Sequence, residues 1–172
     1  MVDAQDKLIA NSEKTVLLWL GEKVTGEHNG TIALKSGWLT WQNNKIVSGE
    51  FLVDMNSLSD ADKSERLEGH LKSDDFFGVE KYPLSKLVIT GSSKLEGGKA
   101  LVKGNLTVKE ATHPVEFTVT ESKEGTVFTY SAEIVFDRSL YDVRFGSGKF
   151  FSNLGDNAIN DEIKLNVKLV VK

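Results

Sequence analysis

The sequence predicts an all-β fold, because apolar and polar residues alternate along most of its segments and turn-forming residues separate those segments. Alternation with a period of two is typical of strands that bury one face and leave the other in water. Short strands joined by hairpins indicate an antiparallel barrel or sandwich. We expect about eight or nine strands, near residues 14–20, 23–34, 36–42, 45–55, 84–92, 99–109, 114–121, 126–137 and 161–171.

The alternation also predicts which side chains share a face. Every second residue from Ile163 to Val171 is apolar, and the same holds from Phe128 to Phe136. Residues 15–20 are instead almost entirely apolar on both faces, which predicts a strand that is covered on its outer side as well. The other faces that we expect are Val47 with Phe51, Val53 and Met55, then Val102 with Leu106 and Val108, and Val115 with Phe117 and Val119.

Turn-forming residues mark the expected hairpins. Asn29-Gly30 is a strong candidate for a two-residue hairpin, since Asn and Gly tolerate the positive φ that such turns require. Further candidates are Gln42-Asn43-Asn44, Gly97-Gly98 and Glu124-Gly125. Closure of the strands into a barrel would remove the exposed edges that an open sheet has to protect.

Two segments interrupt the strand pattern. The first has helical spacing, with Ser57 and Asp60 placed as a capping pair and Leu67 and Leu71 on one face. We therefore expect a short helix near residues 58–72. A short turn at residues 73–77 follows it.

The second irregular segment runs from Phe136 to Asp161 and combines glycines with Tyr141, Phe145, Phe150 and Phe151. Glycines permit a tight backbone, and the aromatic rings need a surface to pack against. The segment predicts either a lid over a barrel mouth or a cluster of side chains packed on the barrel wall.

Composition excludes several classes of protein. The chain has 172 residues, enough for one domain, and carries 21 basic against 25 acidic side chains, a formal charge of -4. A nucleic-acid surface would need clustered Lys and Arg, so we expect no nucleic-acid partner. There is no cysteine, hence no disulfide, zinc-thiolate site or thiol nucleophile.

Targeting signals are not evident. Residues 1–7 carry no secretory signal peptide, and no apolar run approaches the roughly 18 to 20 residues that span a bilayer. The residues alone fit either the periplasm or the cytoplasm.

The three histidines, the serines and the carboxylates form no recognisable catalytic or metal-binding pattern. His28, His70 and His113 are far apart in the sequence and lack metal-ligand spacing. No nucleophile elbow and no phosphate-binding loop is present. The sequence therefore predicts no catalytic residue and no metal ligand. An enzyme acting on a lipid would have to use His28 or His70 inside the barrel.

Several blocks of residues resemble the YceI-like family of bacterial polyisoprenoid-binding proteins. The resemblance extends from about Lys14 to Lys172, and its most specific part is the block from His70 to Pro83. The blocks are Gly26-Glu27-His28-Asn29-Gly30-Thr31-Ile32, Gly49-Glu50-Phe51, Val53-Asp54-Met55, Leu67-Glu68-Gly69-His70-Leu71-Lys72-Ser73-Asp74-Asp75-Phe76-Phe77, Glu80-Lys81-Tyr82-Pro83, Gly104-Asn105-Leu106-Thr107-Val108, His113-Pro114-Val115, Phe136-Asp137-Arg138, Gly146-Ser147-Gly148 and Leu154-Gly155-Asp156.

The resemblance implies an eight-stranded, lipocalin-like antiparallel barrel with an elongated apolar cavity, formed as a single domain by residues 1–172. It implies a non-enzymatic protein that binds and transports or stores an isoprenoid or other long-chain amphiphile. Such ligands include polyprenyl phosphates, quinones and fatty-acid derivatives. It also implies a periplasmic location, transient membrane contact at most, and no resident cofactor beyond the bound lipid. The chain is expected to act as a monomer or homodimer.

Candidate ligand contacts come from the expected inner faces and from the helical segment. Basic residues are candidates for an anionic headgroup at the mouth, through charge-assisted hydrogen bonds. A filled core without ligand explains the alternation equally well, so a solid-core interaction module is the second alternative. The candidates for contact with the lipid are Phe51, Val53, Leu71, Phe76, Leu106, Phe117, Tyr130 and Ile134, and those for the headgroup are Lys72, Lys81, Arg138 and Arg144.

Overall fold

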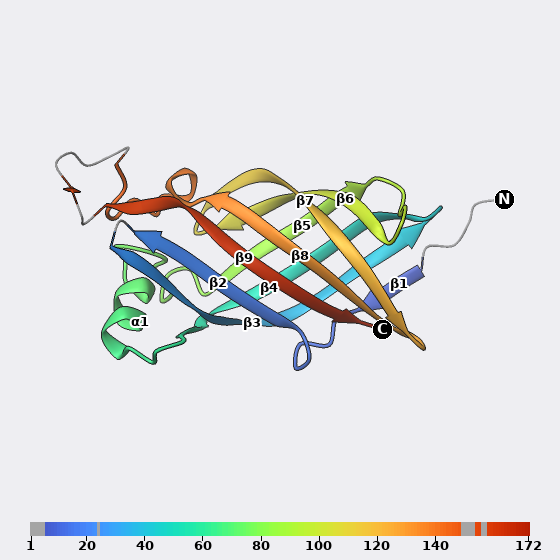
Figure 1. Cartoon of the computed structure of the whole chain (residues 1–172), viewed down its shortest axis with the longest axis horizontal. Helices are drawn as coiled ribbons and strands as arrows, with labels where there is room; N and C mark the ends of the chain where they lie inside the picture. The colour runs from blue at the N-terminus through green and yellow to red at the C-terminus, as the bar shows by residue number, and fades with distance from the viewer. Residues whose placement is uncertain (1–5, 24, 149–153, 156–157) are drawn as a thin grey trace.

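The structure is a computed structural model that describes residues 6–23, 25–148, 154–155 and 158–172. Within these ranges it contains nine strands, one α-helix and one 3-10 helix (Figure 1). They are β1 (Asp6–Ile9), β2 (Val16–Lys23), β3 (Gly26–Gln42), β4 (Lys45–Asp60), α1 (Glu65–Lys72), β5 (Leu84–Ser92), β6 (Lys99–Val108), β7 (Ala111–Glu124), β8 (Val127–Asp137), η1 (Arg138–Tyr141) and β9 (Ile159–Val171).

Strands β2 to β9 form a closed antiparallel barrel. The hydrogen-bonded order runs β3-β2-β9-β8-β7-β6-β5-β4, and β4 pairs again with β3 to close the circle. Closure confirms the predicted eight-stranded barrel and leaves none of these strands with a long free edge. The barrel is elongated, and α1 lies beside one of its two ends (Figure 1).

Strand β1 is an addition that the sequence did not reveal. It pairs antiparallel with residues 38–41 of β3, and Ile9 exchanges two backbone hydrogen bonds with Lys172. It therefore lies between the second half of β3 and the end of β9, where β2, which begins at Val16, does not reach. Its residues Asp6-Lys7-Leu8-Ile9 do not alternate in polarity, so the sequence pattern could not predict this strand.

The predicted strands 23–34 and 36–42 are one continuous strand, β3, whose register shifts between Leu34 and Ser36. Such a bulge bends the strand locally and breaks the sequence pattern. The hairpin predicted at Asn29-Gly30 is wrong, because both residues lie within β3. Gly30 is required for a different reason: a Cβ there would lie 1.8 Å from the backbone oxygen of Ser59 on β4.

The other hairpin predictions are confirmed. Asn43 and Asn44 have φ of 55° and 63° between β3 and β4, and Gly97 and Gly98 have φ of 58° and 77° before β6. Gly125, with φ of 63°, joins β7 to β8. These left-handed conformations are the ones that two-residue hairpins demand.

The helix begins later than predicted. Strand β4 continues to Asp60. Ser57 and Asp60 therefore lie in a strand and are not the helix-capping pair that the sequence predicted. The N-cap of α1 is Ser64, whose hydroxyl accepts a hydrogen bond from the Leu67 backbone N–H at 3.2 Å. The Asp60 carboxylate accepts one from the Ser64 backbone N–H at 3.0 Å. Asp60 thus stabilises the turn between β4 and α1.

Two predictions about faces are wrong. Ile46, not Val47, joins the core with Phe51, because a register shift between β3 and β4 adds a residue near Val47 and reverses the inward face. On β2, Val16 and Leu18 are 41% and 44% exposed, so the outer side of this strand is not covered as expected.

The remaining faces point inward as predicted and build one large core cluster inside the barrel. A second cluster near the α1 end joins Phe76, Val108, Tyr141 and Val143. This cluster matches the second alternative for the segment from Phe136, namely aromatic side chains packed on the barrel. No helix among the described residues is long and apolar enough to cross a membrane.

Candidate functional site

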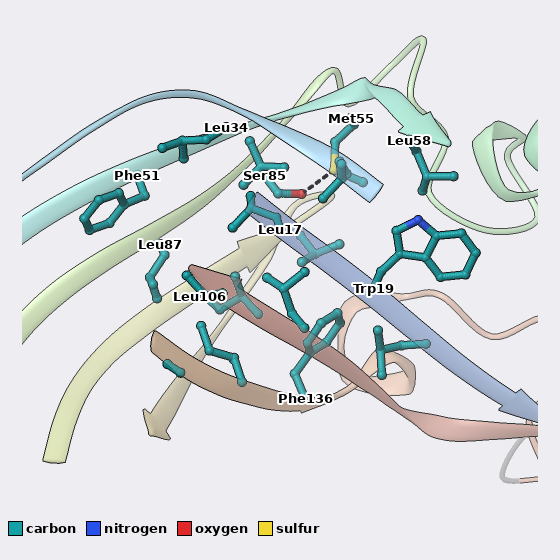
Figure 2. A pocket seen from close by; sticks show the side chains of 18 of the residues that line it. Leu17, Trp19, Leu34, Phe51, Met55, Leu58, Ser85, Leu87, Leu106 and Phe136 are labelled. Atoms are coloured by element: carbon teal, nitrogen blue, oxygen red, sulfur yellow. Dashed lines mark hydrogen bonds between the residues drawn. The ribbon is translucent and has the colours of Figure 1, made fainter. Parts of the chain in front are cut away.

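The barrel encloses a cavity of about 230 Å³. All eight barrel strands and α1 contribute to its lining, which consists almost wholly of aliphatic and aromatic side chains. Figure 2 shows side chains from opposite walls pointing into one shared space, among them Leu17, Phe51 and Leu106. Alternation in the sequence makes most inward positions apolar, and the structure shows that their side chains leave a space across the barrel.

The predicted ligand contacts all lie on the lining of this cavity. Six come from strands β4 and β6 to β8, and two from the helix and the turn that follows it. Their contact with a bound lipid stays a prediction. The eight are Phe51, Val53, Leu71, Phe76, Leu106, Phe117, Tyr130 and Ile134.

The hydroxyl groups of Ser85 and Thr15 in the cavity lining are satisfied within the protein. The Ser85 hydroxyl donates to the Met55 sulfur at 3.0 Å (Figure 2), and the Thr15 hydroxyl accepts from the Val170 backbone N–H at 3.1 Å. Polar groups already paired in this way present little hydrogen-bonding capacity to a ligand. The interior therefore offers a surface suited to hydrocarbon.

Charged and polar lining residues gather where β2 ends and β3 begins. Glu22, Lys23 and His28 belong to the cavity lining, and Gly21 pairs with His28 at this point. The helix side chains Leu67 and Leu71 line the same end, beside which α1 lies (Figure 1). This α1 end of the cavity therefore combines an apolar interior with a polar rim.

Arg138 also lines the cavity, but its guanidinium forms hydrogen bonds with backbone oxygens of the protein. The side chain is 0% exposed and donates to the backbone oxygens of Asn160 at 3.1 Å, Val143 at 2.8 Å and Ile159 at 3.1 Å. Burial lowers the pKa of Arg138, against the opposite influence of the Asp161 carboxylate 3.8 Å away. This arrangement favours a structural role, in which Arg138 joins η1 to the start of β9. Contact with a headgroup stays a prediction.

The other predicted headgroup residues lie outside the cavity lining. Arg144 pairs with the Asp142 carboxylate at 3.0 Å. The Lys81 ammonium lies 5.4 Å from the ring centroid of Tyr82. Hydrogen bonding to the Tyr82 side chain, with its charge interaction, raises the pKa of Lys81. Lys72 occupies the last turn of α1. Their role toward a headgroup is not tested by the structure.

The histidines do not assemble an acid-base pair in the cavity. His28 lies on the rim, and among the described residues no hydrogen bond joins it to a carboxylate or hydroxyl. His70 lies 3.5 Å from the Asp75 carboxylate but is not part of the cavity lining. His113 contacts the Leu140 backbone oxygen at 2.9 Å. No three His, Asp or Glu side chains in the described ranges are placed to hold a metal ion.

The segment from Phe136 to Asp161, predicted as either a lid or a cluster on the barrel wall, is described only in part. Phe145 packs edge-on against His70 at 4.6 Å between ring centroids and lies 5.3 Å from Phe76. These three rings connect the loop after η1 to α1 and the turn that follows it. Phe150 and Phe151 lie outside the described residues.

Sequence reasoning missed several lining residues. Leu17 and Trp19 alternate with apolar neighbours on the outer face, so the pattern could not show which set points inward. Leu58 lines the cavity from the end of β4, in a segment that the sequence predicts as helix. Only the pairing of β3 with β4 shows that this segment is strand.

Comparison with known proteins agrees with this architecture. A family model described as the YceI-like domain matches residues 9–171. The chain belongs to the YceI-like family. The resemblance found in its sequence blocks is thereby confirmed.

Curated relatives of this YceI-like chain are named only as UPF0312 proteins. The relative from Pseudomonas putida strain GB-1 is 33% identical over 97 residues, which make up 56% of this chain and 50% of that protein. The relative from Photorhabdus laumondii is 41% identical over 97 residues, with the same shares of the two chains. The matches thus span about half the length of these relatives.

Solved structures show the same fold. Burkholderia cenocepacia BcnA superposes with a TM-score of 0.77 at 21% identity, covering 95% of this chain and 99% of that one. A polyisoprenoid-binding domain from Saccharophagus degradans, implicated in plant cell wall breakdown, gives 0.70 at 12% identity, covering 96% and 97%. At these identities the likeness establishes the YceI-like fold and nothing finer.

Proposed function

We propose that the protein binds a single long-chain isoprenoid or similar amphiphile inside the barrel and carries or stores it without chemical change. The observation that carries this proposal is the enclosed apolar cavity with its polar groups confined mainly to the rim at the α1 end. The polyisoprenoid-binding domain that shares the fold is consistent with such a ligand.

The size of the cavity favours a slender ligand. Pockets for drug-sized molecules typically span about 300–1,000 Å³, whereas this cavity measures about 230 Å³. An acyclic prenyl or acyl chain fits such a space better than a bulky ring system does. Each methylene removed from water contributes about 0.8 kcal/mol, so ten of them contribute about 8 kcal/mol. A membrane offers the chain a comparable gain, which makes exchange between barrel and bilayer reversible.

The distribution of polar groups gives the ligand a direction. The hydrocarbon tail would lie among the aliphatic side chains, and the headgroup at the rim beside Glu22, Lys23 and His28. A charged or hydroxylated headgroup left in the deep interior would lose its hydration without gaining partners. The headgroup therefore stays at the α1 end in this proposal.

A bound lipid can be detected directly. The protein, purified from its own host without detergent, is measured by native mass spectrometry before and after organic extraction, and the extract is identified separately. We expect an added mass that extraction removes and that a prenyl or acyl lipid restores. A protein that is empty as isolated and also fails to take up farnesol, geranylgeraniol or palmitate would contradict the proposal.

The two alternatives have less support. The interior void disfavours a solid-core interaction module. A lipid-acting enzyme would need His28 beside a catalytic partner, and the described residues supply no hydrogen-bonded one. Unchanged lipid recovered after prolonged incubation is the outcome expected for a carrier. The periplasmic location is also part of the proposal, and fractionation of host cells tests it.

A further inference from the structure

A second hollow lies at the other end of the barrel, opposite α1. This far-end cleft has a volume of about 750 Å³, and charged and polar side chains make up a much larger part of its lining than they do in the inner cavity. Lys7 and Lys123 contribute cations, Glu121 a carboxylate, and Trp41 and Phe128 their rings. A hydrocarbon tail that entered this cleft would meet charged side chains.

Tyr130 separates the two spaces. Among the described residues it is the only one that lines both the inner cavity and the far-end cleft. Its side chain projects inward from β8 and is 2% exposed. The ring therefore forms part of the floor of the inner cavity, at the end away from the polar rim.

Several contacts fix this ring in place. The Tyr130 hydroxyl donates a hydrogen bond of 2.7 Å to the Glu121 carboxylate on the neighbouring strand. The ring stacks on Trp41 with centroids 5.9 Å apart and lies parallel to Phe128 at 6.3 Å. A ring held by a charge-assisted hydrogen bond and two stacking neighbours does not swing aside at little cost.

We propose that Tyr130 sets the maximum length of the hydrocarbon chain that the barrel accepts, by closing the inner cavity against the far-end cleft. This inference rests on the proposed function, since it assigns the tail end of the ligand to Tyr130. A chain that reaches Tyr130 fills the cavity. Any further carbon has to remain at the polar rim or in water, where it gains nothing from burial.

The proposal has a quantitative consequence. Burial of one methylene, about 0.8 kcal/mol, corresponds to a roughly fourfold gain in affinity. Below the limiting length, each added isoprene unit should therefore raise affinity at least about tenfold. Beyond that length the gain should fall below about twofold. Removing the phenol ring frees space for about one isoprene unit, so Tyr130→Ala should move the limit outward by about one unit.

The test is the chain-length profile of binding. All-trans prenyl alcohols from geraniol, farnesol and geranylgeraniol up to solanesol are presented as mixtures to the wild-type protein and to Tyr130→Ala. Occupancy is read by native mass spectrometry. We expect the wild-type profile to level off at one length and the Tyr130→Ala profile to level off about one unit later.

Two matched controls separate the length limit from general effects. Tyr130→Phe keeps the ring and loses only the hydrogen bond to Glu121, so its profile should level off at the wild-type length whatever its overall affinity. Trp38→Ala removes a ring that lines neither the inner cavity nor the far-end cleft, and its profile should be unchanged. If Tyr130→Ala does not fold, Tyr130→Leu should extend the limit and Tyr130→Trp should shorten it.

The outcomes distinguish this inference from the proposed function. If the wild type binds prenyl alcohols but the Tyr130→Ala or Tyr130→Leu profile levels off at the wild-type length, Tyr130 does not limit the chain. If the wild type binds none of these alcohols and no fatty acid, the proposed function fails and this inference fails with it.

Discussion

Filling the cavity from one wall should abolish lipid binding without unfolding the barrel. Ala132 on β8 is the smallest side chain at its level of the lining and pairs with Val119 and Val167 on the flanking strands. In Ala132→Phe the new ring points into the cavity. It occupies space that would otherwise hold about five carbons of the ligand, which removes about 4 kcal/mol of burial, or roughly a thousandfold in Kd.

The same substitution should change the stability of the fold very little. Burying the Phe side chain contributes about 1.5–3 kcal/mol, and repacking the wall around it costs about 1–3 kcal/mol. These two contributions nearly cancel, because the ring enters an existing void and not a filled core. Urea unfolding should therefore give a midpoint close to that of the wild type.

Binding is measured by displacement of a fluorescent fatty acid with geranylgeraniol. Ser131→Phe is the matched control, because Ser131 is the preceding residue on β8, is exposed, and faces outward. The control should bind as the wild type does. If Ala132→Phe folds normally and also binds with wild-type affinity, the lipid does not occupy the barrel interior, and the reasoning from the cavity is wrong.

Three further predictions concern the framework around the cavity. Arg138→Met should lower the free energy of unfolding in urea by about 3–5 kcal/mol, since it leaves three backbone oxygens without their donor; a loss below about 1 kcal/mol would contradict the structural role. Burial raises the pKa of Tyr130, reinforced by Glu121, and that of Tyr141. The folded state thus retains phenol protons that the unfolded chain releases above about pH 10. The free energy of unfolding should keep its full value below that pH and fall above it, and the fall should be shallower in Tyr130→Phe. An equally steep fall in Tyr130→Phe would show that Tyr130 does not cause it. Ser64→Ala should destabilise the protein by about 1 kcal/mol in thermal unfolding, because Ser64 caps α1; an unchanged Tm would show that the cap contributes nothing.

The sequence was most informative where strands alternate cleanly. From Ile163 to Val171 and from Phe128 to Phe136, polarity alone identified the inward face, and these faces line the cavity or build its core. A half-buried strand exposes its periodicity directly in the sequence. The resemblance of sequence blocks then distinguished a closed barrel from a sandwich, which alternation could not do.

The predictions from sequence fail where backbone geometry, and not side-chain polarity, determines which residue points inward and which lies in a turn. The register shift near Val47 moves the inward position to Ile46, and nothing in the local composition shows it. Gly30 was taken as a turn residue, yet it lies within a strand where the Ser59 backbone passes too close for a side chain. Both depend on how β3 and β4 pair, which is a long-range property.

The sequence predicted the apolar side chains of the candidate site, but it could not predict that they enclose a cavity. Polarity located the wall of the cavity, whereas it could not show whether the wall encloses a void or a filled core, because both demand the same apolar side chains. Arg138 illustrates the same limit. A basic residue beside a predicted mouth suggests a headgroup contact, and only the structure shows its donors directed at backbone oxygens.

The location of the lipid can be measured most directly by nuclear magnetic resonance of methyl groups during titration with geranylgeraniol. Val53, Leu106 and Ile134 line the cavity, whereas Leu18 and Val135 lie on the outer surface with 44% and 40% of their area exposed. If the barrel interior holds the chain, the three inner methyl signals shift and show contacts with the prenyl protons, and the two outer signals stay in place. Shifts confined to Leu18 and Val135 would contradict the account.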